Sequence, residues 1–212
     1  MLQEVSKKLL SSKRKKKAST YKNTSNITVF GASGVGKTEI IKTFATSIYG
    51  NTTMFRPTIT ESYERKIILR SQDGTVCKHE LSILDTSGKL RYDFPSVHKQ
   101  AIKNSEAFIL VFALDDEESL NELEYILQDI DAMKKSKNTP VLLIANKSDL
   151  VDNKSFTVHR IRNKLAYLNR GLCFEKCALV GEDINECFVS LLTKLEKRKG
   201  IDRSFYGVQV IC

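Results

Sequence analysis

Short apolar runs alternate with longer amphipathic segments along most of this chain. Residues 107–114 and 140–146 are continuous apolar runs, and such runs are typical of strands buried on both faces of a parallel sheet. Residues 37–49 and 120–133 instead carry apolar side chains at helical spacing. A short β-branched run at residues 26–31 predicts the first strand. The pattern therefore predicts a parallel sheet covered by helices.

Two more strands are predicted on either side of the sequence "SQDG", because Asp-Gly is a strong hairpin signal. Residues 157–169 and 184–198 are amphipathic, and residues 172–178 form the last predicted strand. We therefore expect an α/β, doubly wound fold: a six-stranded, mostly parallel sheet with one antiparallel strand and helices on both faces. Ligands bind such sheets at the carboxyl ends of the strands. The informative loops should follow residues 31, 85, 114, 146 and 178.

The charge of the 212-residue chain divides it into three parts. The net charge is +9, of which residues 1–22 carry +7 and residues 194–203 carry +3. We expect a basic, disordered N-terminal extension (1–24), one folded domain (25–199) and a C-terminal tail (200–212). Because the basic charge lies in the tails, a nucleic-acid-binding face is not expected.

The basic N-terminus has two interpretations. It contacts an anionic membrane or an acidic partner, or it is a solubilising arm or nuclear-import patch. The five cysteines contain no CxxC pair, so they predict reduced thiols in a cytoplasmic protein, without a disulfide framework or zinc site. His79, His98 and His159 are expected at the surface or in the hairpin. Gln209 occupies the fourth position from the end, so no CaaX lipid is expected.

The sequence "GASGVGKT", residues 31–38, fits the phosphate-binding pattern G-x-x-x-x-G-K-[ST] between a strand and a helix. Its backbone N–H groups would surround the phosphates. Lys37 would reach the β- and γ-phosphates, and the Thr38 hydroxyl would bind Mg²⁺. The predicted nucleotide contacts of this segment are Gly31, Ser33, Gly34, Val35, Gly36, Lys37, Thr38 and Glu39.

Two later segments extend this site. In "NKSD" (146–149), Asp149 would accept hydrogen bonds from two guanine donors that adenine lacks. Lys147 would cover the base, and Asn146 would tie this loop to the phosphate loop. In "LDTSG" (84–88), Asp85 would hold Mg²⁺ through water, and the Gly88 N–H would contact the γ-phosphate.

With these motifs, the chain resembles the Ras superfamily of small GTPases over residues 26–198, most closely the divergent Di-Ras and dexamethasone-induced Ras types. The resemblance implies GTP and GDP as ligands, a P-loop NTPase fold, and GTP hydrolysis with Mg²⁺. It implies that Thr58 in "RPTITESY" ligates Mg²⁺ and contacts the γ-phosphate, and that Phe55 covers the nucleotide. The segment "FEKCAL" would contact the base through the Ala178 N–H, flanked by Cys177 and Leu179. Tyr49 either flanks the base or is a core residue at the helix end.

The residue after Gly88 departs from the family pattern. Gln usually stands there and orients the attacking water, whereas Lys89 has only donors. Lys89 would supply positive charge to the phosphoryl oxygens instead, or it has no role. The predicted catalytic residues are Lys37, Thr58, Gly88 and Lys89. Because Lys89 replaces the usual glutamine, we expect GTP hydrolysis to be slow.

Two functions follow from these residues. One is a molecular switch that presents residues 55–63 and 85–98 to effector proteins, with exchange factors and GTPase-activating proteins as regulators. The alternative is a pseudo-GTPase held mainly in the GTP form. An ATP-using kinase is disfavoured by Asp149. Location is expected to be cytoplasmic, peripheral at the inner plasma membrane, or nuclear.

Overall fold

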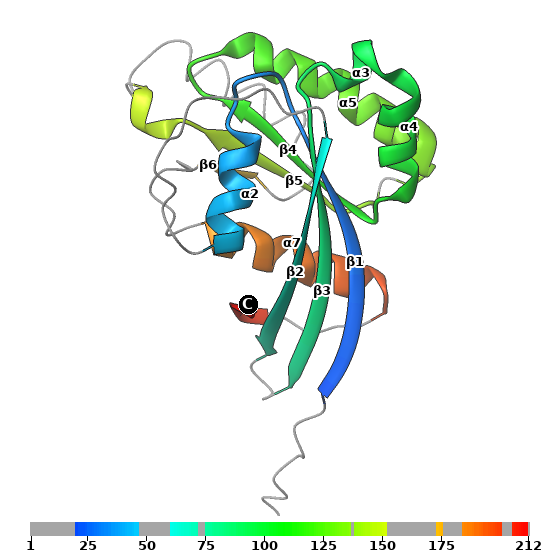
Figure 1. The fold of residues 1–212 in the computed structure, drawn as a ribbon, viewed down its shortest axis with the longest axis vertical. Coiled ribbons are helices and arrows are strands. Elements are labelled where there is room, and N and C mark those ends of the chain that lie inside the picture. Colours follow the sequence, from blue (N-terminus) through cyan, green and yellow to red (C-terminus); the bar gives the residue numbers. More distant parts are fainter. Residues whose placement is uncertain are drawn as a thin grey trace, which may run out of the picture.

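A single mixed sheet with helices on both faces organises the described part of the chain (Figure 1). The computed structural model describes residues 20–46, 60–71, 75–136, 138–151, 173–175, 184–200 and 205–211. The strands are β1 (Thr20–Phe30), β2 (Thr60–Ser71), β3 (Val76–Thr86), β4 (Ala107–Ala113), β5 (Val141–Asn146), β6 (Cys173–Glu175) and β7 (Phe205–Ile211). The helices are α2 (Lys37–Thr46), α3 (Leu90–Asp93), α4 (Pro95–Asn104), α5 (Glu117–Lys134), the 3₁₀ helix η1 (Ser148–Leu150) and α7 (Ile184–Arg198). The helix predicted over 157–169 lies outside these ranges.

The strand directions confirm the predicted mixed sheet. The order is β6-β5-β4-β1-β3-β2-β7, and β2 runs antiparallel to both of its neighbours. The other pairings are parallel, so β2 is the one strand that opposes the rest of this sheet, as the Asp-Gly turn signal predicted. The chain forms β2 and β3 on one side of β1 and then crosses to β4 on the other side of β1. A ligand site is expected at that reversal.

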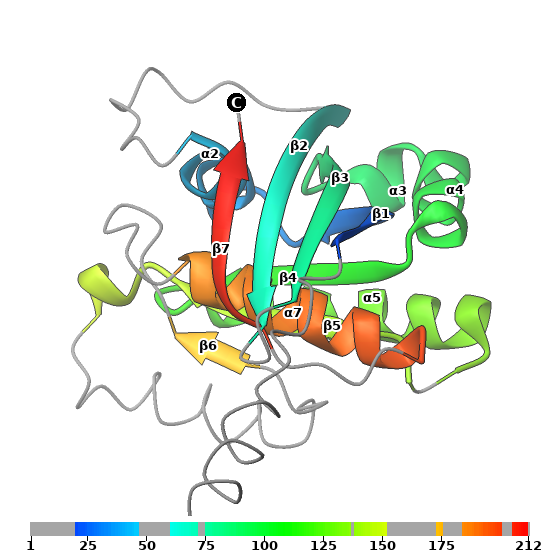
Figure 2. The same cartoon turned by 90° about the horizontal axis from the view of Figure 1, so that it is seen from below.

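The two ends of the folded domain differ from the sequence prediction. β1 begins at Thr20 and pairs with β3 from the Thr20–Val76 position onward, so residues 20–24 belong to the sheet and not to a disordered extension. Residues 205–211, assigned to the tail, form a seventh strand beside β2 (Figure 2). Both additions depend on backbone hydrogen bonds to distant strands, and local composition does not report such bonds.

Alternate residues of the central strands enter two separate cores. On one face, Ile27 and Val29 of β1 pack with α2 and α7. On the other face, Phe30 packs with α4 and α5. Alternate side chains of β4 also enter the two cores, because successive side chains of a strand point to opposite faces of the sheet. Within the described ranges, no helix is long and apolar enough to span a bilayer.

His79 lies in the predicted hairpin, although its side chain is buried, whereas the surface position expected for His98 is wrong. His79 lies at an inward-facing position of β3 with 1% of its surface exposed, and His98 on α4 is also buried. His98 packs against Phe30, with 4.9 Å between ring centroids. Both side chains face partners contributed by distant elements, so their spacing along the chain carried no sign of burial. His159 lies outside the described residues.

Deleting residues 205–212 should destabilise the domain. Phe205 is buried in the core beside α7, and losing a buried aromatic side chain costs at least about 2 kcal/mol of unfolding free energy. The deletion also uncovers the edge of β2 along Lys66–Ser71, which favours aggregation. Urea unfolding and light scattering measure both effects. Phe205→Leu keeps the strand and should lose less than about 1.5 kcal/mol; an unchanged urea midpoint for the deletion would contradict the role given to β7.

Candidate functional site

Four loops meet at the carboxyl ends of parallel strands. The first, Gly31–Gly36, joins β1 to α2, and the second follows β3 at Ser87. The third follows β4 at Leu114, and the fourth follows β5 at Lys147. The parallel ladders β1–β3, β1–β4 and β4–β5 align these strand ends along one edge of the sheet. The motifs at residues 31–38, 84–88 and 146–149 are therefore brought together, as expected for this fold.

Two glycines allow the first loop to approach its neighbours closely. Gly36 has φ +92°, and a Cβ there would lie 2.3 Å from Asn146 Nδ2. At Gly31, φ is +150° and a Cβ would lie 2.0 Å from the Val111 carbonyl oxygen on β4. Any side chain at these positions would push the loop away from β4 and β5. Val35 is buried, whereas Ser33 and Gly34 are exposed at the tip of the loop.

Lys37 is held inside this loop. Its ammonium group donates hydrogen bonds to the carbonyl oxygens of Gly31 (2.9 Å) and Ala32 (2.7 Å), and only 7% of its surface is exposed. Burial lowers the pKa of Lys37 to about 8, against an opposing effect of Asp85. The loop thus concentrates one desolvated positive charge beside its own backbone. Glu39 follows in the first turn of α2, 3.6 Å from Lys42 Nζ.

Thr38 and Asp85 form the second part of the site. The Thr38 hydroxyl donates to Asp85 Oδ2 at 2.5 Å, which joins the start of α2 to the end of β3. Burial raises the pKa of the Asp85 carboxyl group, opposed by the Thr38 hydrogen bond and by Lys37. The other carboxylate oxygen, Oδ1, is buried and has no hydrogen-bond partner. A hydroxyl beside a carboxylate with a free buried oxygen suits a hard cation, so these residues fit Mg²⁺.

Gly88 touches the first loop directly. A Cβ at Gly88 would lie 2.1 Å from the Ser33 backbone nitrogen, so only glycine allows the two backbones to lie this close. Lys89 follows at the start of α3, where its carbonyl oxygen accepts from the N–H groups of Tyr92 and Asp93. Its side chain is exposed. The structure therefore places Lys89 at the end of the loop that approaches Ser33, with its side chain exposed to solvent.

The fourth loop is tied to the first by Asn146. Its side-chain amide donates to the Val35 carbonyl oxygen at 2.8 Å, which confirms the predicted tie between the two loops. Lys147 adopts a left-handed backbone with φ +63°, and its ammonium lies 3.4 Å from Asp115 Oδ2. Asp149 lies in η1 and is exposed. The sequence predicts a ligand-binding loop after residue 114, but it does not identify Asp115 as the partner of Lys147.

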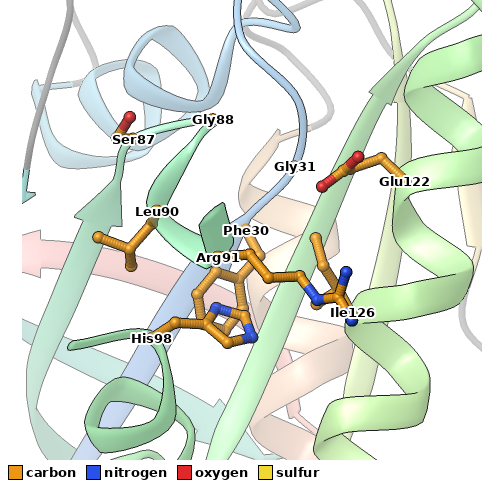
Figure 3. Close-up of a pocket in the computed structure, with 9 residues that line it drawn as sticks. All are labelled: Phe30, Gly31, Ser87, Gly88, Leu90, Arg91, His98, Glu122 and Ile126. Carbon is orange, nitrogen blue, oxygen red and sulfur yellow. The ribbon is translucent and has the colours of Figure 1, made fainter. Parts of the chain in front are cut away.

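The segment after Gly88 packs on α5 through polar contacts. Figure 3 shows a small pocket there, with Arg91 and His98 pointing toward α5. Arg91 Nε donates to Asp129 Oδ2 at 2.7 Å, and His98 Nε2 lies 3.1 Å from the same oxygen. The pocket is lined by Phe30, Gly31, Ser87, Gly88, Leu90, Arg91, His98, Glu122 and Ile126.

These contacts also set the ionisation of the Arg91–His98–Asp129 cluster. Burial lowers the pKa of His98, against the opposing effect of Asp129. Burial alone would raise the pKa of Asp129, but the Arg91 hydrogen bond and charge hold it below its usual value. The cluster therefore favours a neutral histidine beside an arginine–carboxylate pair. Sequence reasoning did not find it, because Asp129 is more than 30 residues from His98 and no spacing rule joins them.

Six predicted site residues lie outside the described ranges: Tyr49, Phe55, Thr58, Cys177, Ala178 and Leu179. Their roles stay predictions.

Replacing Asn146 by alanine should destabilise the protein. The change removes the hydrogen bond to the Val35 carbonyl, a buried contact between β5 and the first loop. Leaving a buried acceptor unpaired costs about 1–3 kcal/mol of unfolding free energy, which denaturant unfolding measures. Asn138→Ala is the matched control, because Asn138 is exposed and should change stability by less than about 0.5 kcal/mol. Equal stabilities for the two variants would rule out the tie as a stabilising contact.

Comparison with known proteins assigns the family. The model described as "Ras family" matches residues 26–197. The GTP-binding protein Di-Ras1 of Mus musculus is 34% identical over 188 residues, covering 87% of this chain and 88% of the relative; Di-Ras1 of Homo sapiens gives the same figures. Di-Ras2 of Mus musculus is 30% identical over 186 residues, again covering 87% and 88%. The chain therefore belongs to the Ras family, as a divergent Ras-like small GTPase.

Proposed function

We propose that this protein is a guanine-nucleotide-dependent switch that binds GTP and GDP with Mg²⁺ and hydrolyses GTP slowly. The observation that carries the proposal is that Lys37, Thr38 and Asp85 meet at the carboxyl ends of β1 and β3. There, the buried Oδ1 atom of Asp85 lacks a hydrogen-bond partner. Family membership supports it, and the relatives Di-Ras1 and Di-Ras2 are named as GTP-binding proteins.

The phosphates would lie in the loop from Gly31 to Thr38. Its backbone N–H groups and the start of α2 favour negative charge. Lys37 would exchange its carbonyl contacts at Gly31 and Ala32 for phosphate oxygens, which accept more strongly from an ammonium. Mg²⁺, held by Thr38 and Asp85, would supply charge neutralisation at the β- and γ-phosphates. Gly88 is supported as a γ-phosphate contact by its approach to Ser33.

The base would be selected by the loop after β5. Asp149 is exposed in η1, with its carboxylate available to accept from guanine N1–H and N2–H₂. Adenine would leave this carboxylate without a matching pair of donors. The Lys147–Asp115 ion pair would hold the lysine stem over the base.

Slow hydrolysis rests on Lys89. An ammonium group cannot accept a hydrogen bond from the attacking water, so Lys89 would not position that water as a glutamine does. It would still add positive charge near the phosphoryl oxygens, but a solvent-exposed ammonium is a weak substitute for fixed positioning. Thr58, expected to share this work, lies outside the described residues.

The segment 85–98 is proposed as an effector surface together with 55–63. Within residues 85–98, the side chains of Tyr92, Phe94 and Val97 are exposed: 58%, 45% and 44% of their surfaces are accessible to solvent. Apolar residues exposed together on one segment are typical of a protein-binding surface. Exchange factors and GTPase-activating proteins would act on the same two segments. Contact between the basic N-terminus and an anionic membrane is proposed from its charge alone.

Asp149→Ala should remove the preference for guanine. We expect its affinity for GTP to fall about 100-fold or more, with ATP binding unchanged, because the lost carboxylate contacts only guanine donors. Fluorescent-nucleotide competition with GTP and ATP measures both. Glu64→Ala on β2, also an exposed carboxylate, is the matched control and should bind as wild type. If wild type binds both nucleotides equally, the guanine assignment is wrong.

Lys89→Gln should raise the rate of GTP hydrolysis about tenfold or more, because glutamine can accept from the water and orient it. Single-turnover hydrolysis of preloaded GTP measures the rate. Lys99→Gln is the control, because Lys99 is also an exposed lysine and lies on α4 beyond the proposed surface.

A second function, a pseudo-GTPase, is favoured by the same Lys89. It predicts that purified wild-type protein carries mainly GTP and does not turn it over at a measurable rate. Equal, measurable rates in wild type and Lys89→Gln would instead show that Lys89 does not limit hydrolysis.

A further inference from the structure

Three side chains with metal-binding chemistry meet inside the domain, away from the candidate nucleotide site. Cys77 and His79 are two residues apart on β3 and therefore share one face of the sheet. Glu196 comes from α7, which packs on that face. All three residues are buried, and one ligand atom from each lies within 4.8 Å of the other two.

The contact between His79 and Glu196 has ion-pair distance but lacks hydrogen-bond alignment. His79 Nε2 lies 3.3 Å from Glu196 Oε1, yet neither ring nitrogen of His79 has a hydrogen-bond partner. Two ligands about 2.1 Å from a tetrahedral zinc ion are about 3.4 Å apart. The imidazole and carboxylate are therefore separated as two ligands of one ion would be, without hydrogen-bond alignment to each other.

An outer partner holds the carboxylate in place. The Asn23 amide nitrogen on β1 lies 3.0 Å from Glu196 Oε1 and 2.9 Å from Oε2. Hydrogen bonds of this kind orient the ligands of metal sites. Glu196 has no exposed surface, and burying a charge without compensation is costly. A thiolate at Cys77 and the carboxylate at Glu196 would together neutralise a divalent cation.

We propose that Cys77, His79 and Glu196 bind one zinc ion that fastens α7 to the ends of β1 and β3 that lie far from the nucleotide site. Figure 1 shows α7 crossing these strands. Sulfur, nitrogen and oxygen ligands together favour zinc over magnesium. The three side chains supply three of the four positions that zinc usually fills, and binding releases the Cys77 thiol proton to solvent.

This zinc site is independent of the proposed nucleotide switch. His79 lies six residues before Asp85 on β3, which is about 20 Å along a strand. No zinc-binding spacing is recognisable along the chain, because Glu196 lies more than 100 residues after His79. Only the packing of α7 on β3 brings the three residues together.

Cobalt binding tests the proposal. The full-length chain is stripped of transition metals, kept in excess Mg²⁺ and titrated with Co²⁺. We expect a thiolate-to-cobalt charge-transfer band that saturates at one Co²⁺ per chain and disappears when Zn²⁺ is added. Cobalt replacing Mg²⁺ near Asp85 would have oxygen ligands only and would produce no such band, so failure of one site is distinguishable from failure of the other.

Variants locate the cobalt. Cys77→Ala should abolish the band, and Glu196→Gln should weaken Co²⁺ binding at least tenfold. Cys187→Ala is the matched control, because Cys187 is a buried cysteine on α7 outside the cluster, and it should keep the band. Absence of the band in wild type, a measurement that does not depend on any variant folding, would overturn the proposal. So would a band that survives in Cys77→Ala.

Discussion

Parallel pairing of β1 with β3 is the constraint on which the rest of the site depends. The ladder runs from Thr20–Val76 to Val29–Asp85, so the loop after β1 begins beside the carboxylate that ends β3. The hydrogen bond from Thr38 to Asp85 and the close approach of Gly88 to Ser33 are possible only in this register. A shift by one residue would turn Asp85 to the opposite face of the sheet and separate it from Thr38. The chemistry of four residues is thus set by the pairing of two strands.

The second constraint is the desolvation of charge around that pairing. Lys37 and Asp85 are both buried, and burial disfavours the charged form of each. The loop carbonyls and the Thr38 hydroxyl compensate only in part, which leaves Asp85 Oδ1 without a partner. A site arranged in this way gains by taking up a polyanion together with a cation. Buried polar groups also meet at His79 and Glu196, whose side chains are both shielded from solvent.

Much of the fold could be predicted from the sequence, because its signals are local. The apolar runs of β4 and β5, the Asp-Gly hairpin signal in the sequence before β3 and the glycine-rich segment after β1 each indicate the structure of their own part of the chain. The tie from Asn146 to Val35 was also predictable, since the fold brings those two loops together. Other features were not: β7, the burial of His79 and the Arg91–Asp129 pair each depend on segments far apart in the chain. Side-chain pairing between such segments leaves no periodic pattern in either one.

The arrangement of β7 has a consequence for how the sheet can grow. β2 is a twelve-residue strand, and β7 covers its outer edge only from Lys66 to Ser71. Among the described residues, the half from Thr60 to Arg65 keeps its outer N–H and C=O groups without a strand partner. A full-length open edge would be a template for self-association, whereas this half edge is short and is bordered by the end of β7. β7 thus pairs with part of the outer edge of β2, and any additional strand would have to pair with β2 before Lys66.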